Sequence, residues 1–368
     1  MKVRGQLEAL RKTEPSDDGA TMLFDLGSDR TVEIVRRSVC WVEGGAVMMA
    51  RDCGRRQVLA VDLDEFGAAA HFSGERRQVE PDVEVCLGEL DHKNAMALRE
   101  VYENARPQPL GLDDSFGLGD RLGIAGPAHL RSMVGSGFKV VLAQQSIREL
   151  ERTERTPDEV MDAATWAILE EGWTEAWGAD ADHLKTSADV ELMAAAGFTM
   201  FTIDPGDHVV DAADTMSMDE LQKGAADLPW SELEDTVDAA VDRYSGQSID
   251  VGPGLTLQPS AEDVLRAWVK YGAPLAHTAK MYRHIASTMG QRPFEVEVSV
   301  DETASVTTPF EHWLVASELR RLGVEWIGLA PRFVGDFEKG VDYRGDLEVF
   351  RGEYLKHLAI AESLGPYK

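Results

Sequence analysis

The stretch Gly178-Ala-Asp-Ala-Asp-His-Leu-Lys-Thr186 predicts a short strand that ends in ionisable side chains. His183 and Lys185 lie two residues apart, so they share one face of an extended chain. Phe201-Thr-Ile-Asp-Pro-Gly-Asp-His208 repeats the pattern, with Thr202 on its polar face. Strands of this kind, each followed by a helix, indicate a parallel barrel, whose chemistry lies at the carboxyl ends of its strands.

From about residue 115 onward, strand-like and helix-like segments alternate along the chain. Three helix starts carry a capping box, in which two side chains bond the free backbone N–H groups: Thr156-Pro-Asp-Glu159, Ser217-Met-Asp-Glu220 and Thr308-Pro-Phe-Glu311. Strands that alternate with capped helices are typical of βα units on a parallel sheet. The expected strands are 120–125, 139–146, 181–186, 198–204, 294–301 and 324–333.

This pattern contains six strand–helix units, whereas a closed (β/α) barrel has eight. The last helix is expected at 346–364, and Tyr367-Lys368 resembles the first step of another strand. The Gly-rich stretch 245–259 is expected to be a loop. The sequence therefore predicts a TIM-type (β/α) barrel over 115–368 that is incomplete as given, or else an open sheet.

Residues 1–105 have a different character, because short apolar runs such as Gln57-Val-Leu-Ala-Val61 are separated by Gly and Asp clusters. This spacing predicts a small β-rich accessory domain. Two prolines and a glycine in 106–114 break any periodicity and predict a linker. The catalytic domain is then expected to be 115–368.

The charge and cysteine content narrow the function classes. A net charge of −28 argues against nucleic acid and anionic membranes as partners. No apolar run reaches about 18 residues and no signal peptide opens the chain, so we expect a cytoplasmic protein. Cys40, Cys53 and Cys86 lack the spacing of a disulfide framework or a zinc cluster. A homo-oligomer is compatible with this composition.

The segment Glu295-Val-Glu-Val-Ser-Val-Asp301 shows the clearest alternation in the chain. Its acidic and hydroxyl side chains share one face, and its three valines share the other. So many carboxylates inside a barrel would need a metal ion or cationic side chains nearby. The alternative is an antiparallel strand with one solvated face.

Several other side chains at strand ends suit catalysis or sugar binding. His183 is the best metal-ligand candidate, and Asp182 and Lys185 beside it make a plausible acid–base set, although a histidine on a strand is often structural. Gln144 and Ser146 suit a polyhydroxylated ligand, and Arg332 could hold a carboxylate with two bonds. Because no G-x-G-x-x-G or Walker pattern follows a strand, we expect no nucleotide site.

Taken together, six stretches resemble the tagaturonate (fructuronate) epimerase family of hexuronate catabolism. They occur in the family's order and span most of 115–368. The stretches are 119–123, 142–146, 178–186, 201–209, 297–303 and 329–335.

The resemblance implies a metal-dependent barrel enzyme that interconverts D-tagaturonate and D-fructuronate, with a sugar acid as its small-molecule partner. It implies Asp182 as the proton acceptor and His183 as a ligand of a divalent metal such as Mn, Ni or Zn. Ser146 and Thr202 would be substrate contacts, and Glu297 would be the proton donor. Family members continue into two more strands, each with a further histidine for the site, which this sequence does not contain.

The inverted carbon lies β to the ketone, so enolisation alone would invert the wrong centre. Retro-aldol cleavage, rotation of the aldehyde and re-addition would solve this. Asp182 would serve as base, a metal on His183 as Lewis acid, and Lys185 and Arg332 as cations for the carboxylate. Two alternatives remain: a metal-dependent ketose or uronate aldolase, and a truncated, non-catalytic subunit.

Overall fold

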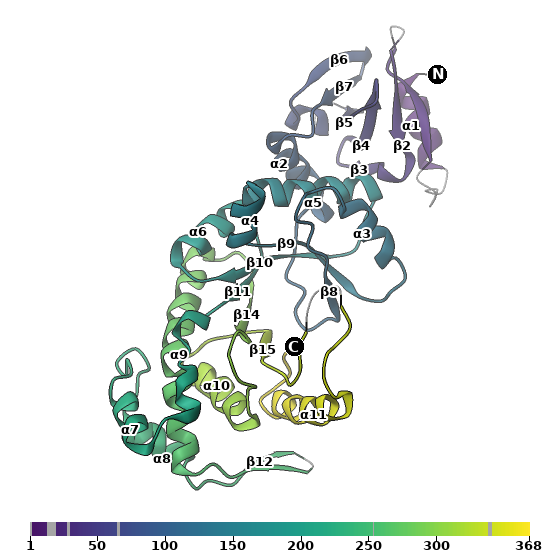
Figure 1. The fold of residues 1–368 in the computed structure, drawn as a ribbon. Coiled ribbons are helices and arrows are strands. Elements are labelled where there is room, and N and C mark those ends of the chain that lie inside the picture. The colour runs from purple at the N-terminus through teal and green to yellow at the C-terminus, as the bar shows by residue number, and fades with distance from the viewer. Residues whose placement is uncertain (1, 13–19, 28–29, 65–66, 253, 338–340) are drawn as a thin grey trace. The chain divides into compact units, whose positions relative to one another are not determined.

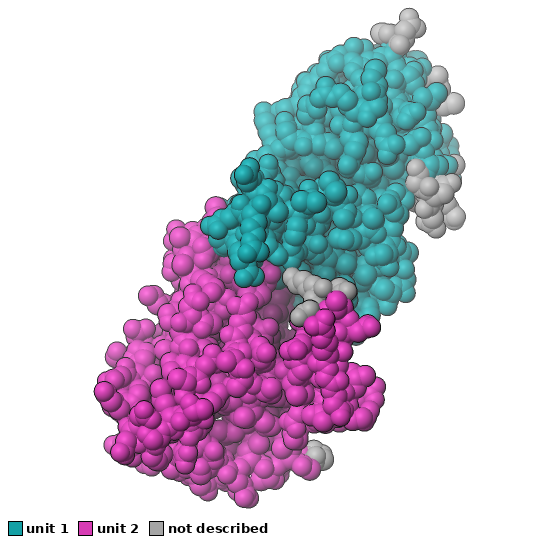
Figure 2. All heavy atoms as spheres, in the orientation of Figure 1, with its two compact units in different colours: residues 1–180, 195–199 teal, residues 181–194, 200–368 magenta. Residues whose placement is uncertain are grey.

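The computed structural model describes residues 2–12, 20–27, 30–64, 67–252, 254–337 and 341–368. Two compact units divide the chain (Figure 2): unit 1 comprises Met1–Asp180 and Ala195–Thr199, and unit 2 comprises Ala181–Ala194 and Met200–Lys368. This boundary falls inside a strand. The linker predicted at 106–114 separates a β-rich domain from a catalytic domain and does not coincide with this boundary. That division into domains stays a prediction.

Unit 1 opens with a seven-stranded antiparallel sheet in the order β1-β2-β4-β5-β7-β6, with β3 paired to β4. A β-rich region at the start of the chain is therefore confirmed. The strands are β1 (Thr21–Asp25), β2 (Thr31–Val35), β3 (Cys40–Val42), β4 (Gly45–Asp52), β5 (Arg55–Asp62), β6 (Glu75–Glu80) and β7 (Val83–Gly88).

Alternation along β4 gives this sheet two buried faces. Met48 belongs to a cluster with Leu7 of α1 (Val3–Arg11). Met49 belongs to a second cluster that contains residues of α2 (His92–Val101) and α5 (Pro157–Glu171). Because successive side chains of a strand point to opposite faces, helices can cover the sheet on both sides (Figure 1).

The rest of unit 1 begins the parallel sheet. It contains β8 (Ser115–Gly117), α3 (Gly126–Met133), β9 (Lys139–Ser146), α4 (Ile147–Thr153), α5 and the first half of β10 (Trp177–Leu184). β8 and β9 are parallel. The strand predicted at 120–125 is wrong, since the Asp120 carboxylate accepts hydrogen bonds from four backbone N–H groups between Leu122 and Gly126 and closes a turn there.

Unit 2 continues the sheet and adds most of the helices. Its elements are the end of β10, most of α6 (Ser187–Ala196), β11 (Met200–Ile203), α7 (Met218–Ala226), α8 (Val237–Tyr244), β12 (Ile249–Gly252), β13 (Leu255–Leu257), α9 (Ala261–Met289), β14 (Glu295–Val300), α10 (Pro309–Arg321), β15 (Gly328–Pro331) and α11 (Leu347–Ser363). α7 and α8 lie beside α9 (Figure 1). Apolar side chains of the three helices form one cluster. Residues 245–259 contain the antiparallel pair β12–β13, so the loop predicted there is wrong in part.

The parallel sheet has the strand order β15-β14-β11-β10-β9-β8. The Thr199 N–H donates to the Ala179 carbonyl, and the Asp204 N–H donates to the Leu184 carbonyl. The later residue of one segment thus bonds to the later residue of the other, as in parallel strands. Lys368 bonds to Ile327 and Leu329 in the pattern of a parallel bridge, which agrees with the strand step predicted at 367–368. An α/β fold with a parallel sheet is confirmed, and the closed barrel stays a prediction.

The predicted capping boxes are present at α5, α7 and α10. No helix in the described ranges is both long and apolar enough to cross a membrane.

We expect Thr156→Ala to lower the free energy of unfolding by about 1 kcal/mol, because the first turn of α5 loses an acceptor for the Glu159 N–H. Urea denaturation measures this. Ser287→Ala, an exposed serine within α9, is the control and should change stability by less than about 0.5 kcal/mol.

Candidate active site

The end of β10 holds Asp182 and His183 as a bonded pair. His183 Nδ1 lies 2.5 Å from Asp182 Oδ1, and His183 Nε2 lies 4.0 Å from Glu302 Oε1. The hydrogen bond with Asp182 raises the pKa of His183 to about 9. His183 also has a left-handed backbone, with φ of 53°. Non-glycine residues rarely adopt this conformation, and such strain clusters at functional sites.

Glu297 lies on β14, opposite Thr202 of β11 and Gly328 of β15 in the parallel register. Burial, first, and then the charges of Asp182 and Asp301 raise the pKa of Glu297 to about 7. A Cβ atom at Gly328 would lie 3.1 Å from Glu297 Oε2, so the glycine leaves room for the carboxyl group. Asp182 and Glu297 are therefore close enough in unit 2 for the charge of Asp182 to act on the Glu297 carboxyl group.

The alternation predicted for β14 is confirmed. Val296, Val298 and Val300 are buried on one face, and Glu295 and Ser299 are also buried. β14 pairs in parallel with a strand on each side, so the alternative of a solvated antiparallel strand is wrong. On the polar face Glu297 is half-buried and Asp301 is exposed, so this face runs from the interior to the surface along the chain.

Lys185 follows the pair on β10, and its amine binds two carboxylates. Nζ lies 2.8 Å from Asp207 Oδ1 and 3.5 Å from Asp204 Oδ2. Asp204 is 2% exposed, so the amine balances a buried charge. The sequence did not indicate this arrangement, because Asp207 is 22 residues away along the chain. A substrate contact by Lys185 stays a prediction.

Arg332 follows β15 and is held through its backbone. Its N–H donates to Thr307 Oγ1 at 3.0 Å, and its carbonyl accepts from the Thr307 N–H at 2.9 Å. The guanidinium group is partly exposed. Carboxylate binding by Arg332 stays a prediction, as does substrate binding by Thr202, which is 2% exposed.

Gln144 and Ser146 belong to unit 1, at the end of β9. Gln144 Nε2 donates to Asp180 Oδ2 at 3.1 Å. Ser146 is the N-cap of α4 and accepts from the Glu149 N–H, so its hydroxyl group already has a structural task. Arg121 donates to the Gln144 carbonyl at 3.1 Å and pairs with Glu149 at 2.9 Å. Substrate contacts by Gln144 and Ser146 stay predictions.

The donor set can be tested against the proposed metal. His183 resembles one ligand, because Asp182 orients its ring through Nδ1 and leaves Nε2 for a cation. Among the described residues, however, no three His, Cys, Asp or Glu side chains gather in a way that could hold a metal ion. The described residues therefore show no complete ligand set, and metal binding by His183 stays a prediction.

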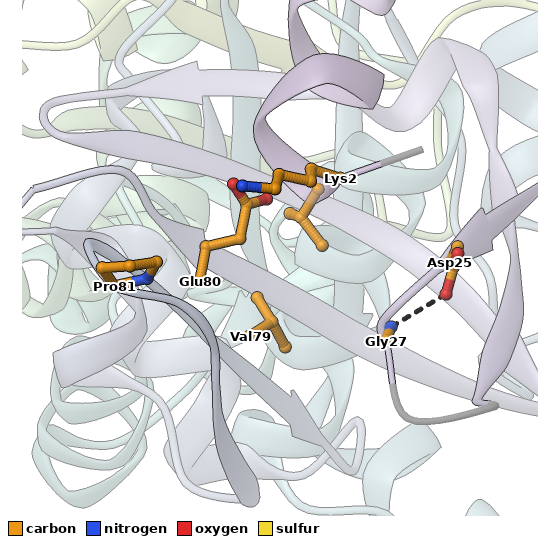
Figure 3. Close-up of a pocket in the computed structure, with 7 residues that line it drawn as sticks. Lys2, Asp25, Gly27, Val79, Glu80 and Pro81 are labelled. Carbon is orange, nitrogen blue, oxygen red and sulfur yellow. Dashed lines mark hydrogen bonds between the residues drawn. The ribbon is translucent and has the colours of Figure 1, made fainter.

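One hollow lies at the N-terminal sheet of unit 1 (Figure 3). It has a volume of 520 Å³ and contains none of the predicted site residues. Lys2 and Glu80 point toward each other across it, and the Gly27 N–H donates to the Asp25 carboxylate. We assign it no role. Its lining residues are Lys2, Val3, Asp25, Gly27, Val79, Glu80 and Pro81.

The chain matches known proteins over most of its length. A family model described as UxaE, tagaturonate epimerase, matches residues 35–368. A tagaturonate/fructuronate epimerase of Thermotoga maritima is 41% identical over 280 residues, which are 76% of this chain and 56% of that protein. The chain thus spans a little over half the length of this relative.

Crystal structures of the fructuronate-tagaturonate epimerase UxaE of Cohnella laeviribosi, native and in complex with glycerol, are similar in fold. Each matches with a TM-score of 0.82 and 36% identity, covering 92% of this chain and 66% of the other. The matched family model and these relatives agree, so the chain belongs to the tagaturonate epimerase family.

Proposed function

We propose that this chain is an epimerase of hexuronates that interconverts D-tagaturonate and D-fructuronate. The observation that carries the proposal is the pair of carboxyl groups with different environments. The Asp182 carboxylate is paired with the His183 ring, whereas burial raises the pKa of Glu297 and favours its protonated form. A carboxylate paired with a histidine and a buried carboxyl group suit a base and an acid in one reaction. The family membership supports the substrate class.

A retro-aldol path fits these groups. Asp182 takes the proton of the hydroxyl group on the carbon to be inverted, and the bond between this carbon and the next one toward the ketone breaks. The bonding pair forms an enolate, and Glu297 donates its proton to the enolate oxygen. The new aldehyde rotates and the enol carbon adds to its other face. Glu297 then recovers its proton, and Asp182 returns a proton to the new alkoxide.

The remaining residues would bind and orient the substrate. We propose that Arg332 holds its carboxylate and that Thr202 and Lys185 contact its hydroxyl groups or charge. Gln144 and Ser146 of unit 1 are proposed as further sugar contacts. Two-bond recognition of a carboxylate by a guanidinium group fixes both position and orientation.

A divalent metal ion, Mn, Ni or Zn, is also part of the proposal, with His183 as one ligand. When bound, such an ion acts as a Lewis acid and stabilises an enolate oxygen. The described residues do not complete its coordination, so no step above depends on it.

The test is product analysis with the full chain. We expect D-tagaturonate, incubated with the protein and Mn²⁺, Ni²⁺ or Zn²⁺, to give one six-carbon product, D-fructuronate, identified by NMR. Two smaller products would indicate an aldolase instead. No conversion together with no metal binding would contradict the proposal, and tightly bound NAD in the purified protein would argue against the retro-aldol path.

A further inference from the structure

Lys270 is a buried cation that the proposed reaction does not use. It lies on α9 with 1% of its surface exposed. Its amine binds Glu311 Oε1 at 3.0 Å, both Asp214 oxygens at 3.3 Å and Ser305 Oγ at 2.8 Å. Burying an ammonium group is costly unless carboxylates and hydrogen bonds compensate, and here they do.

These partners come from separate parts of unit 2. Asp214 lies in the short helix Asp211–Thr215, and Glu311 lies in the first turn of α10. Ser305 lies in the segment Asp301–Thr307, which connects β14 to α10. The Ser305 hydroxyl also donates to the Asp214 carboxylate, so amine, hydroxyl and carboxylate form a closed set. We call Lys270, Asp214, Ser305 and Glu311 the Lys270 cluster.

The segment Asp301–Thr307 is fixed at several points. The Ala304 N–H donates to Asp211 Oδ1 at 3.0 Å, and Ser305 belongs to the Lys270 cluster. At its far end, Thr307 exchanges two hydrogen bonds with the backbone of Arg332. One buried amine therefore anchors a segment that begins beside the acidic face of β14 and ends on Arg332.

The position of this segment matters for two proposed functional groups. Asp301, at its start, raises the pKa of Glu297, as Asp182 of β10 does. His183 of β10 and, more weakly, Lys368 lower it. Arg332, at its end, is the proposed carboxylate ligand. A small displacement of the segment would change both the acidity of Glu297 and the place of the guanidinium group.

We propose that Lys270 is a positioning residue, which holds the segment Asp301–Thr307 in place and thereby sets the environment of Glu297 and the position of Arg332. This inference rests on the proposed function for its effect on activity. Lys270 touches none of the proposed reacting groups, so its influence passes through Ser305 and Thr307. The polar groups of the Lys270 cluster bond to one another, as expected for a structural role and not for a second binding site.

The test uses Ser305→Ala as the main variant, because Lys270→Met removes the cation that balances the buried Glu311 carboxylate and can prevent folding. In Ser305→Ala we expect faster backbone hydrogen exchange in 301–307, and a pKa of Glu297, followed by NMR of ¹³C-labelled glutamate, that moves toward the ordinary value. We also expect kcat/KM for tagaturonate to fall about tenfold, since small misplacements of catalytic groups are costly. Lys270→Arg should keep most of these properties.

Lys280→Met is the matched control, since Lys280 is exposed on the same helix. It should change none of these quantities. A folded Ser305→Ala protein with an unchanged Glu297 pKa would overturn the inference, whatever its hydrogen exchange. If the unaltered chain proves inactive, the proposed function fails, but the Glu297 pKa and the exchange of 301–307 still decide whether Lys270 positions this segment.

Discussion

Asp182→Asn is expected to lower kcat for the epimerisation by about 10²- to 10⁴-fold, the usual contribution of a general base. The amide keeps the size of the side chain but cannot accept the hydroxyl proton. It also removes the charge that raises the pKa of His183. Steady-state kinetics with tagaturonate, followed by NMR of the product, measures the loss.

The control for this variant is Asp242→Asn, an exposed aspartate on α8. It should leave kcat within about twofold, because exposed substitutions away from a site have small effects. Urea denaturation of Asp182→Asn checks that the fold persists. A folded Asp182→Asn protein that keeps its kcat would remove Asp182 from the mechanism and leave the base unidentified.

The sequence located the acidic face and its neighbours because these depend on local periodicity. The alternation of 295–301 has a period of two, and such a period places side chains on known faces whatever the rest of the chain does. The adjacency of Asp182 and His183 likewise needs only the chain itself. Parallel pairing of the kind that the βα rhythm predicted then brings Glu297 opposite Thr202, a register that the sequence did not indicate.

The structural features that could not be predicted from the sequence are side-chain contacts, most of them between residues that are distant along the chain. Lys270 and Glu311 are 41 residues apart, and neither has a signature in its own surroundings. Asp120 was expected inside a strand, but its carboxylate binds the following N–H groups and makes a turn. Side-chain hydrogen bonds of this kind compete with strand pairing and leave no periodic trace.

The contact between His312 and His357 also joins residues that are distant in the sequence. It leads to a second prediction with a large effect, on the pH dependence of stability. Their Nδ1 atoms lie 2.9 Å apart, the rings are stacked, and each residue is 3% exposed. The Tyr367 hydroxyl lies 2.7 Å from His312 Nε2. The two histidines are 45 residues apart in the sequence, so local periodicity does not indicate that they meet. The fold makes them a buried polar pair that joins α10 and α11.

We expect this pair to make the protein sensitive to acid. Burial, helped by His357, lowers the pKa of His312 to about 3, and burial also lowers the pKa of His357. In the unfolded chain both titrate near 6.5. Below that pH the two histidines bind protons in the unfolded state but not in the folded state. Their contribution to the free energy of unfolding is therefore fully present above about pH 6.5 and declines as the pH falls toward 3. Each histidine contributes at most about 1.4 kcal/mol per pH unit.

Urea denaturation between about pH 5 and pH 7 measures this dependence. In His312→Gln the free energy of unfolding should depend less steeply on pH, because the unfolded chain has one titrating group fewer. His71→Gln, on an exposed histidine of unit 1, should leave the slope unchanged. An equal slope in all three proteins would mean that His312 binds protons equally in the folded and unfolded states, and it would contradict the lowered pKa of His312 on which the acid sensitivity depends.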